Sequence, residues 1–227
     1  VSVRGRSVGR RVGVRMRGGL DMQQVLLGSV PERPAASAFG SAESIGDSVY
    51  LCQGRHQKSD LQLTGGFWKL NLAAIDSGWQ ALPKHPGPVR FKMSTAVQQG
   101  PGGEACLFLF SGTSTSETDQ GDPRFHAYTD GYRYSPLERL WSEVASLPLL
   151  DDPRHLAGEE KFANERWPIS ASCAESVGTR TILTFSGSTD RYILDDNGKV
   201  LPAAVRPPFL PRVLSYDTVT DRWSDVG

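Results

Sequence analysis

The chain has 227 residues, enough for one large domain or two small ones, and 38% of them are hydrophobic. Its 25 basic and 25 acidic side chains cancel, so no global field favours nucleic acid or an acidic membrane surface. No apolar run approaches the ~20 residues that span a bilayer, so we expect no membrane span. The 24 glycines and 15 prolines favour a turn-rich all-β chain over a helical one.

The N-terminal residues 1–22 are rich in arginine and glycine, and their first acidic residue is Asp21. They lack the apolar segment of ~7–15 residues that a secretory signal contains. A disordered extension, a nucleic-acid-binding tail and a transit segment are all compatible with such a composition. We expect a disordered extension, no nucleic-acid partner, and one domain over 23–227. Val25–Val30 is interpreted as the last strand of an earlier repeat.

The later chain contains three tryptophans in matching frames: Trp79, Trp141 and Trp223. Each follows an alternating strand and a polar turn, which predicts a β-hairpin whose second strand opens with tryptophan. Seven residues before each tryptophan stand, in order, Leu72, Tyr134 and Tyr216.

An apolar run that ends in glycine precedes each hairpin: "VYLCQG" at Val49–Gly54, "LFLFSG" at Leu107–Gly112 and "ILTFSG" at Ile182–Gly187. Each run follows a strand of small and apolar residues, from which a glycine-containing turn separates it. One unit therefore comprises four antiparallel strands. We predict three such units, at about 34–82, 89–144 and 168–226.

The continuously apolar second strands predict burial on both faces, as in a radial array where each four-stranded blade lies between two neighbours. We expect Gly112 to take a positive φ or to lie against a close neighbour where the chain leaves its strand. Because propellers close with about 4–8 blades, three units predict a fragment of a longer chain, about half of an expected six-bladed ring. Ring closure by oligomerisation and an incomplete gene product are the alternatives.

The three cysteines, Cys52, Cys106 and Cys173, are odd in number and lack a Cys-x-x-Cys spacing. We interpret them as small apolar core residues. The histidines share no short spacing, so we expect neither a metal site nor a cofactor.

The unit resembles the kelch repeat of β-propellers, in which the second strand ends in glycine, the third carries a tyrosine and the fourth begins with tryptophan. The Gly-Gly doublet of that repeat is degenerate here, at Gln53-Gly54, Ser111-Gly112 and Ser186-Gly187. The resemblance implies an all-β, kelch-type propeller with four-stranded antiparallel blades.

Strand direction places the loops between second and third strands, and the connections between blades, on one rim. These loops, at 55–66, 113–130 and 188–211, are long enough to be functional. Charged residues that we expect to line this rim are His85, Arg90, His126, Asp130, Asp151, Asp152, Arg154, His155, Asp190, Arg191 and Arg206.

A closer resemblance rests on "GWQALPKHPGPVR", "AYTDGYRYSP" and above all "RPPFLPRVLSYDTVTDRW". Over roughly residues 25–227 the chain is similar to about half of a member of the cyclically permuted N-acetylneuraminate mutarotase/epimerase family. The resemblance implies a six-bladed propeller that interconverts sialic acid anomers without a cofactor. It also implies a periplasmic or secreted location.

The resemblance also implies site residues. Arg90 matches an arginine that follows a proline-containing connector, and guanidinium groups suit bidentate binding of a carboxylate. Family members place an acid where this chain has Ser188, so Asp190 is the substitute acid, and His126 is a second candidate for proton transfer. Arg191 and Arg206 are the further candidates for substrate binding.

Two functional hypotheses follow from the sequence. The first is a mutarotase/epimerase-like propeller, a cofactor-independent isomerase that acts on a sialic-acid-like sugar. The second is a non-catalytic kelch propeller that binds a protein or a glycan through its rim loops. A non-functional gene fragment is the remaining alternative.

Overall fold

The computed structural model describes all-β structure. The described residues are 30–32, 37–38, 40–52, 54–56, 65–117, 123–151, 166–167, 172–185, 187 and 212–227. The rim residues Asp152, Arg154, His155, Asp190, Arg191 and Arg206 lie outside them, as does Ser188. Most of the expected strand at Val25–Val30 and the extension 1–22 are outside them too.

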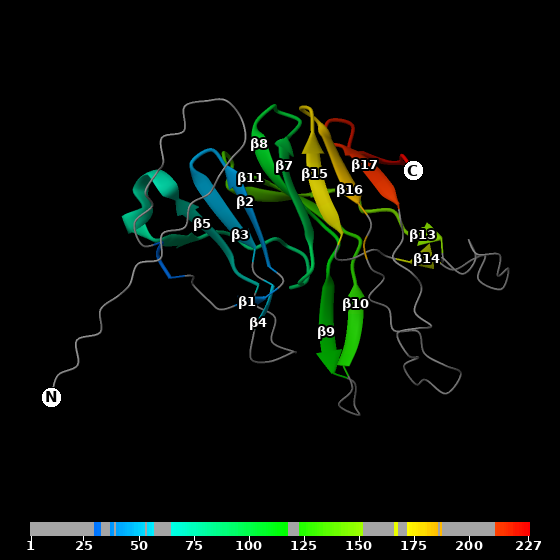
Figure 1. Ribbon diagram of the computed structural model, residues 1–227, viewed down its shortest axis with the longest axis horizontal. Helices are drawn as coiled ribbons and strands as arrows, with labels where there is room; N and C mark the ends of the chain where they lie inside the picture. Colours follow the sequence, from blue (N-terminus) through cyan, green and yellow to red (C-terminus); the bar gives the residue numbers. More distant parts are fainter. Residues whose placement is uncertain are drawn as a thin grey trace.

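Three four-stranded antiparallel sheets follow one another along the chain and stand side by side in Figure 1. We call them blades 1, 2 and 3. Blade 1 is formed by β2 (Ser41–Ile45), β3 (Ser48–Cys52), β5 (Phe67–Asn71) and β6 (Trp79–Ala81). Blade 2 is formed by β7 (Ser94–Gln99), β8 (Ala105–Phe110), β11 (Gly131–Ser135) and β12 (Leu140–Val144). Blade 3 is formed by β15 (Cys173–Val177), β16 (Thr181–Phe185), β17 (Val213–Asp217) and β18 (Arg222–Asp225).

Short pairs of strands extend from the ends of the blades. They are β1 (Ser37–Ala38) with β4 (Arg55–His56), β9 (Thr113–Glu117) with β10 (Pro123–Ala127), and β13 (Leu150–Asp151) with β14 (Arg166–Trp167). The β9–β10 hairpin continues beyond β8 and projects below the sheets in Figure 1. It belongs to the long loop between the second and third strands of blade 2.

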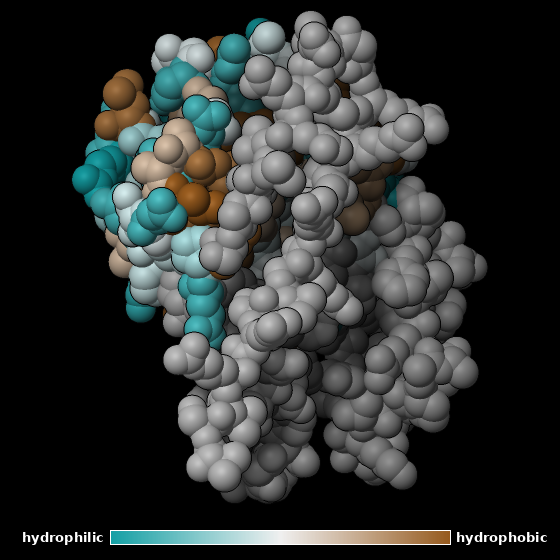
Figure 2. Space-filling view, turned by 60° about the vertical axis from the view of Figure 1, so that its left-hand side comes forward, coloured by the Kyte–Doolittle hydropathy of each residue, from teal (hydrophilic) through white to brown (hydrophobic). Residues whose placement is uncertain are grey.

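The core lies between the blades. The strand β8 is completely buried from Cys106 to Phe110, as its unbroken apolar run predicts. Leu107 and Leu109 pack toward blade 1, whereas Phe108 and Phe110 pack toward blade 3. On the side of the molecule shown in Figure 2, hydrophobic side chains reach the surface among hydrophilic ones.

The glycine that ends β8 behaves as predicted. Gly112 has a φ of 105°, and a Cβ there would lie 3.0 Å from both Arg90 Cδ and the carbonyl oxygen of Phe91. The corresponding Gly187 in blade 3 has a φ of 140°. A positive φ favours glycine at both positions, where the chain leaves the inner strand, and the close contacts favour it further at Gly112.

The register of blade 1 corrects one sequence-based equivalence. Tyr134 pairs with Trp141 and Tyr216 pairs with Trp223, but the partner of Trp79 is Leu70 rather than Leu72. The difference arises because the turn of blade 1 holds a 3₁₀ helix, Leu72–Ser77. The Asn71 side chain caps this helix by accepting a hydrogen bond from the backbone N–H of Ala73 (3.0 Å).

The three tryptophans make the same contact between successive segments. The Trp141 indole N–H donates to the carbonyl of Pro83 (2.8 Å), and that of Trp223 donates to the carbonyl of Ala145 (3.0 Å). The Trp79 indole N–H likewise donates to the carbonyl of Pro31 (3.3 Å). Trp141 and Trp223 thus each bind their blade to the segment that follows the outer strand of the preceding blade.

The cysteine prediction is only partly confirmed. Cys52 and Cys106 are buried, and burial raises the pKa of each thiol to about 12. Cys173 is exposed on β15, so its assignment to the core was wrong. Its residue type suits a core, but no described blade covers the face on which it lies.

Candidate functional site

The predicted site residues lie at the rim end of blade 2 wherever they are described. Arg90 ends the connector from blade 1, and His126 is an exposed residue of β10. Asp190, Arg191 and Arg206 remain predictions.

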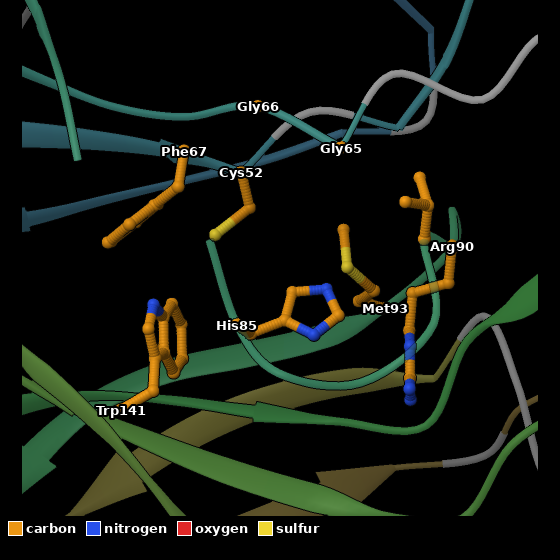
Figure 3. A pocket seen from close by; sticks show the side chains of 9 residues that line it. Cys52, Gly65, Gly66, Phe67, His85, Arg90, Met93 and Trp141 are labelled. Carbon is orange, nitrogen blue, oxygen red and sulfur yellow. The ribbon is translucent and has the colours of Figure 1, made fainter. Parts of the chain in front are cut away.

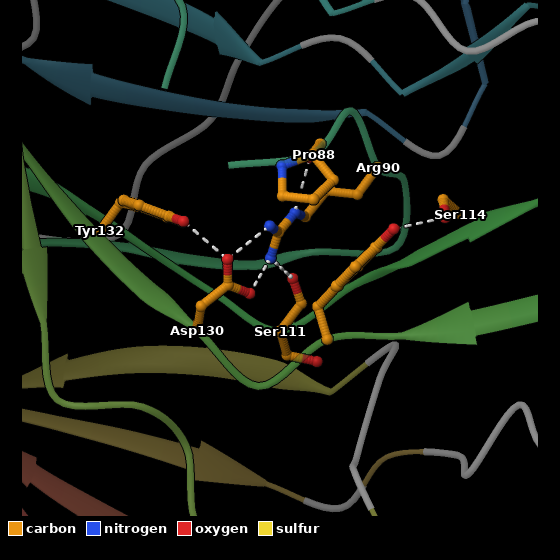
Figure 4. Close-up of polar contacts among 7 residues, drawn as sticks. Pro88, Arg90, Ser111, Ser114, Asp130 and Tyr132 are labelled. Carbon is orange, nitrogen blue, oxygen red and sulfur yellow. Dashed lines mark hydrogen bonds and ion pairs between the residues drawn. The ribbon is translucent and has the colours of Figure 1, made fainter. Parts of the chain in front are cut away.

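Arg90 is the largest completely buried side chain of the described residues. Its Nε donates to the carbonyl of Pro88 (3.0 Å), and Nη1 donates to the carbonyl of Ser111 (3.1 Å). Nη1 and Nη2 also donate to the two carboxylate oxygens of Asp130, at 2.5 and 2.7 Å (Figure 4). Four of the five N–H donors of a guanidinium are therefore used inside the protein.

Asp130 is held by two side chains. The Tyr132 hydroxyl donates to its Oδ2 (2.7 Å), beside the bond from Arg90. Burial alone would raise the pKa of Asp130, but the hydrogen bonds from Arg90 and Tyr132 and the charge of Arg90 outweigh it, so the pKa lies below its usual value. Burial and the neighbouring carboxylate raise the pKa of Tyr132 to about 12. At neutral pH the cluster therefore contains a carboxylate and a neutral phenol.

An aromatic ring completes this arrangement, which we call the Arg90 cluster: Arg90, Ser111, Tyr128, Asp130 and Tyr132. The Arg90 guanidinium carbon lies 4.4 Å from the centre of the Tyr128 ring, a cation–π distance. The Tyr128 hydroxyl shares a hydrogen bond of 2.7 Å with Ser114 on β9. The cluster thus joins the interblade connector to the base of the β9–β10 hairpin.

Backbone strain gathers around the cluster. Among the described non-glycine residues, Lys92, Ser111, Arg139 and Asp221 have a positive φ. Arg139 and Asp221 occupy the same turn in blades 2 and 3, two residues before each tryptophan. Lys92 and Ser111, with φ of 57° and 63°, instead flank the Phe91–Thr113 bridge beside Arg90. Such conformations cost roughly 1–3 kcal/mol each, so the packing here is strongly determined.

The connector also comes unusually close to the cluster. A Cβ on Gly87 would lie 2.4 Å from the Tyr132 hydroxyl oxygen and 2.7 Å from Nη2 of Arg90. Both atoms are hydrogen-bonded to Asp130, so a side chain at position 87 would have to push them away from that carboxylate.

The charge arrangement bears on the predicted role of Arg90. Its side chain is 0% exposed, whereas that of Asp130 is 32% exposed. A sugar carboxylate would have to displace Asp130 before it could make a bidentate contact with Arg90. The sequence placed both residues on the rim but did not pair them. Their positions in the chain were what placed them on the rim. Arg90 lies at the end of the connector before the first strand of blade 2, and Asp130 ends the loop before the third strand.

A small pocket lies beside the cluster, with room for about one water molecule. Figure 3 shows the His85 ring between Trp141 and Phe67 on one side and Arg90 on the other. The ring centres of His85 and Tyr132 are 5.4 Å apart. The Nδ1 atom of His85 is buried and has no hydrogen-bond partner in the described structure. Burial, and secondarily the positive charge of Arg90, lowers the pKa of His85 to about 4.

We expect His85 to make the fold sensitive to mild acid. Its pKa is about 4 in the folded chain and ~6.5 in the unfolded chain, so the unfolded chain binds more protons between these values. The free energy of unfolding should therefore fall by at most about 3 kcal/mol as the pH drops from ~6.5 to about 4. Urea unfolding of wild type and His85→Gln at several pH values measures the effect. The variant should lose most of this pH dependence, and His126→Gln, which changes an exposed histidine, should keep it. Equal slopes for wild type and His85→Gln would contradict the assignment.

The described residues contain no group of three or more histidine, cysteine, aspartate or glutamate side chains that could hold a metal ion. Among them there is likewise no helix long and apolar enough to cross a membrane.

Comparisons with known proteins agree with the fold. No protein-family model matches the chain. It is 24% identical over 203 residues to N-acetylneuraminate epimerase of Shigella sonnei (strain Ss046), covering 87% of this chain and 50% of the relative. It is 25% identical over 128 residues to the protein of the same name from Yersinia enterocolitica serotype O:8 / biotype 1B (strain NCTC 13174 / 8081), covering 56% of this chain and 28% of the relative. A solved structure described as "Structure of YjhT" superposes with a TM-score of 0.58 at 19% identity, over 87% of this chain and 53% of that chain.

The chain is a kelch-type β-propeller of four-stranded antiparallel blades, three of which lie within the described residues. Within this class it resembles the N-acetylneuraminate epimerases. It spans half the length, or less, of the curated relatives that it matches.

Proposed function

We propose that this chain is part of a mutarotase/epimerase-like propeller that interconverts the anomers of a sialic-acid-like sugar. The observation that carries the proposal is the similarity to proteins named N-acetylneuraminate epimerase over 87% of this chain. We further propose that the active ring needs more than the three blades, since the relatives are about twice as long.

The proposed reaction needs only proton transfer. A base removes the proton of the anomeric hydroxyl, the bond between the anomeric carbon and the ring oxygen breaks, and a carbonyl forms. The ring oxygen keeps the electron pair of that bond and takes a proton from an acid, and the ring then recloses on the other face. Asp190 and His126 are the proposed acid and base, with Arg90, Arg191 and Arg206 as the cations that would attract a sugar carboxylate.

NMR of a freshly dissolved single anomer of N-acetylneuraminate tests the proposal. We expect the full-length propeller that contains this chain to accelerate anomer exchange, and Asp190→Asn to lose roughly 100-fold or more of that acceleration, the usual contribution of a proton-transfer group. The control is Asp225→Asn, which changes an exposed carboxylate on the outer strand β18 and should keep the wild-type rate. Exchange no faster than in buffer, with the folded full-length propeller, would refute catalysis.

A second function, a non-catalytic module that binds a protein or a glycan through the rim loops, is favoured by one specific observation. The guanidinium of Arg90 is already committed to Asp130 and to two backbone carbonyls. Calorimetric binding of N-acetylneuraminate without accelerated exchange would favour this function over the first.

A further inference from the structure

The Arg90 cluster is arranged around the position of one carboxylate. Nη1 and Nη2 of Arg90 donate to the two carboxylate oxygens of Asp130, at 2.5 and 2.7 Å, and the Tyr132 hydroxyl donates to Oδ2 at 2.7 Å. Figure 4 shows these donors converging on the carboxylate from two sides. A bidentate guanidinium with a further donor is also an arrangement by which proteins bind the carboxylate of a ligand.

The donors are held in place by groups other than that carboxylate. The carbonyls of Pro88 and Ser111 accept hydrogen bonds from Arg90, at 3.0 and 3.1 Å. The Tyr128 ring lies 4.4 Å from the guanidinium carbon, and Tyr132 is a buried residue of strand β11. The guanidinium and the phenol would therefore keep their positions if the carboxylate between them moved away.

Asp130 is the member of the cluster that can move. Its side chain is 32% exposed, against 0% for Arg90, so the carboxylate lies on the solvent side of the ion pair. It lies between β10 and β11, outside both strands. Its backbone carbonyl accepts a hydrogen bond from the Ser111 N–H (3.3 Å), which holds the main chain. A change of side-chain rotamer is therefore sufficient to turn the carboxylate outward.

We propose that Asp130 occupies the position of a ligand carboxylate and is displaced by it. In the bound state the two oxygens of the ligand accept hydrogen bonds from Nη1 and Nη2 of Arg90, the Tyr132 hydroxyl donates to one of them, and Asp130 turns toward solvent. Tyr132 is then a further ligand-binding residue, and Asp130 determines specificity. The inference rests on the proposed function in one respect, since it takes the ligand to be the sugar acid.

Charge explains why the displacement is selective. When one carboxylate leaves and another enters, the buried cation of Arg90 keeps a partner. A neutral sugar in the same position would leave that cation buried and unpaired, which is costly. Asp130 also competes with the ligand, because the position is free only in the fraction of molecules in which its side chain has turned out.

Chemical rescue of the chain itself tests the position without the sugar. Asp130→Ala removes the internal carboxylate, and saturating sodium formate, the smallest carboxylate, should raise the midpoint of thermal unfolding by roughly 2–4 °C over sodium chloride of equal ionic strength. If the variant is unfolded in chloride, recovery of the circular dichroism signal in formate is the same readout. Asp225→Ala, which empties an exposed ion pair with Arg212, is the matched control and should not respond to formate.

Calorimetry on the full-length propeller that contains this chain tests the displacement. Asp130→Asn should lower the Kd for N-acetylneuraminate at least roughly tenfold, because the internal competitor loses its charge. Tyr132→Phe should raise that Kd by roughly tenfold, the usual effect of losing a hydrogen bond to a charged group. The methyl ester of N-acetylneuraminate, which has no free carboxylate, should gain nothing from Asp130→Asn.

The two experiments separate this inference from the proposed function. Absence of a formate effect on Asp130→Ala would overturn the inference, and so would N-acetylneuraminate that binds Asp130→Asn no more tightly than wild type. A formate effect without any binding of N-acetylneuraminate would instead refute the sugar acid of the proposed function and leave the carboxylate position supported. Tightened binding without accelerated anomer exchange would refute catalysis alone.

Discussion

Phe110→Ala is expected to destabilise the chain by about 3–5 kcal/mol, the usual loss when a buried phenylalanine is truncated. Phe110 is completely buried between blades 2 and 3, where its ring contacts those of Tyr216 and Trp223 at centroid distances of 5.0 and 4.9 Å. Gly131 lies against the Phe110 ring and has no side chain that could fill the cavity left by the substitution. Urea unfolding, followed by tryptophan fluorescence, measures the loss.

Phe185→Ala is the matched control for that variant. It removes the same side chain from the corresponding position of blade 3, which is 39% exposed. We expect a smaller loss, about 1–2 kcal/mol, because Phe185 is only partly buried. Equal losses for the two variants would show that Phe110 does not gain its burial from blade 3.

Arg90→Met is expected to cost about 3–5 kcal/mol, comparable to the loss at Phe110. Methionine keeps much of the apolar stem but removes the charge, which leaves Asp130 partly buried without its cation. It also leaves the carbonyls of Pro88 and Ser111 without their donors. Chemical denaturation measures the stability, and NMR titration should show the pKa of Asp130 rising from its lowered value.

Arg212→Met is the control for that change. Arg212 pairs with Asp225 in an exposed ion pair, which contributes at most about 1 kcal/mol. Adding Asp130→Asn to Arg90→Met should recover part of the lost stability, because the unpaired charge disappears. A fully additive double variant would mean that the two side chains are not coupled.

The fold was largely predictable because its signals are local. Alternation with a period of two, glycine-containing turns and the three tryptophans are sufficient to define four-stranded units. The register of blade 1 was not predictable by spacing, because a 3₁₀ turn lengthened the hairpin between Leu70 and Trp79. The exposure of Cys173 was equally hidden, since burial of a propeller strand depends on the next blade and not on the strand itself.

The candidate site was less predictable, because it is made by segments far apart in sequence. Strand direction correctly brought Arg90 and Asp130 to one rim, but a bidentate pair requires a geometry that no local pattern specifies. The orphan Nδ1 of His85 left no trace in the sequence either, since its burial comes from Trp141 and Phe67 on other strands. Asp190 lies outside the described residues, and its role stays a prediction.

The backward direction of the tryptophan contacts has a consequence for synthesis on the ribosome. Trp141 binds the carbonyl of Pro83 and Trp223 binds that of Ala145, so every acceptor has left the ribosome before its donor is made. Each new blade can therefore dock as soon as its own fourth strand emerges, without waiting for later residues. Such a chain is suited to folding from its N-terminus as it is synthesised, with the newest blade always the one that has an uncovered side.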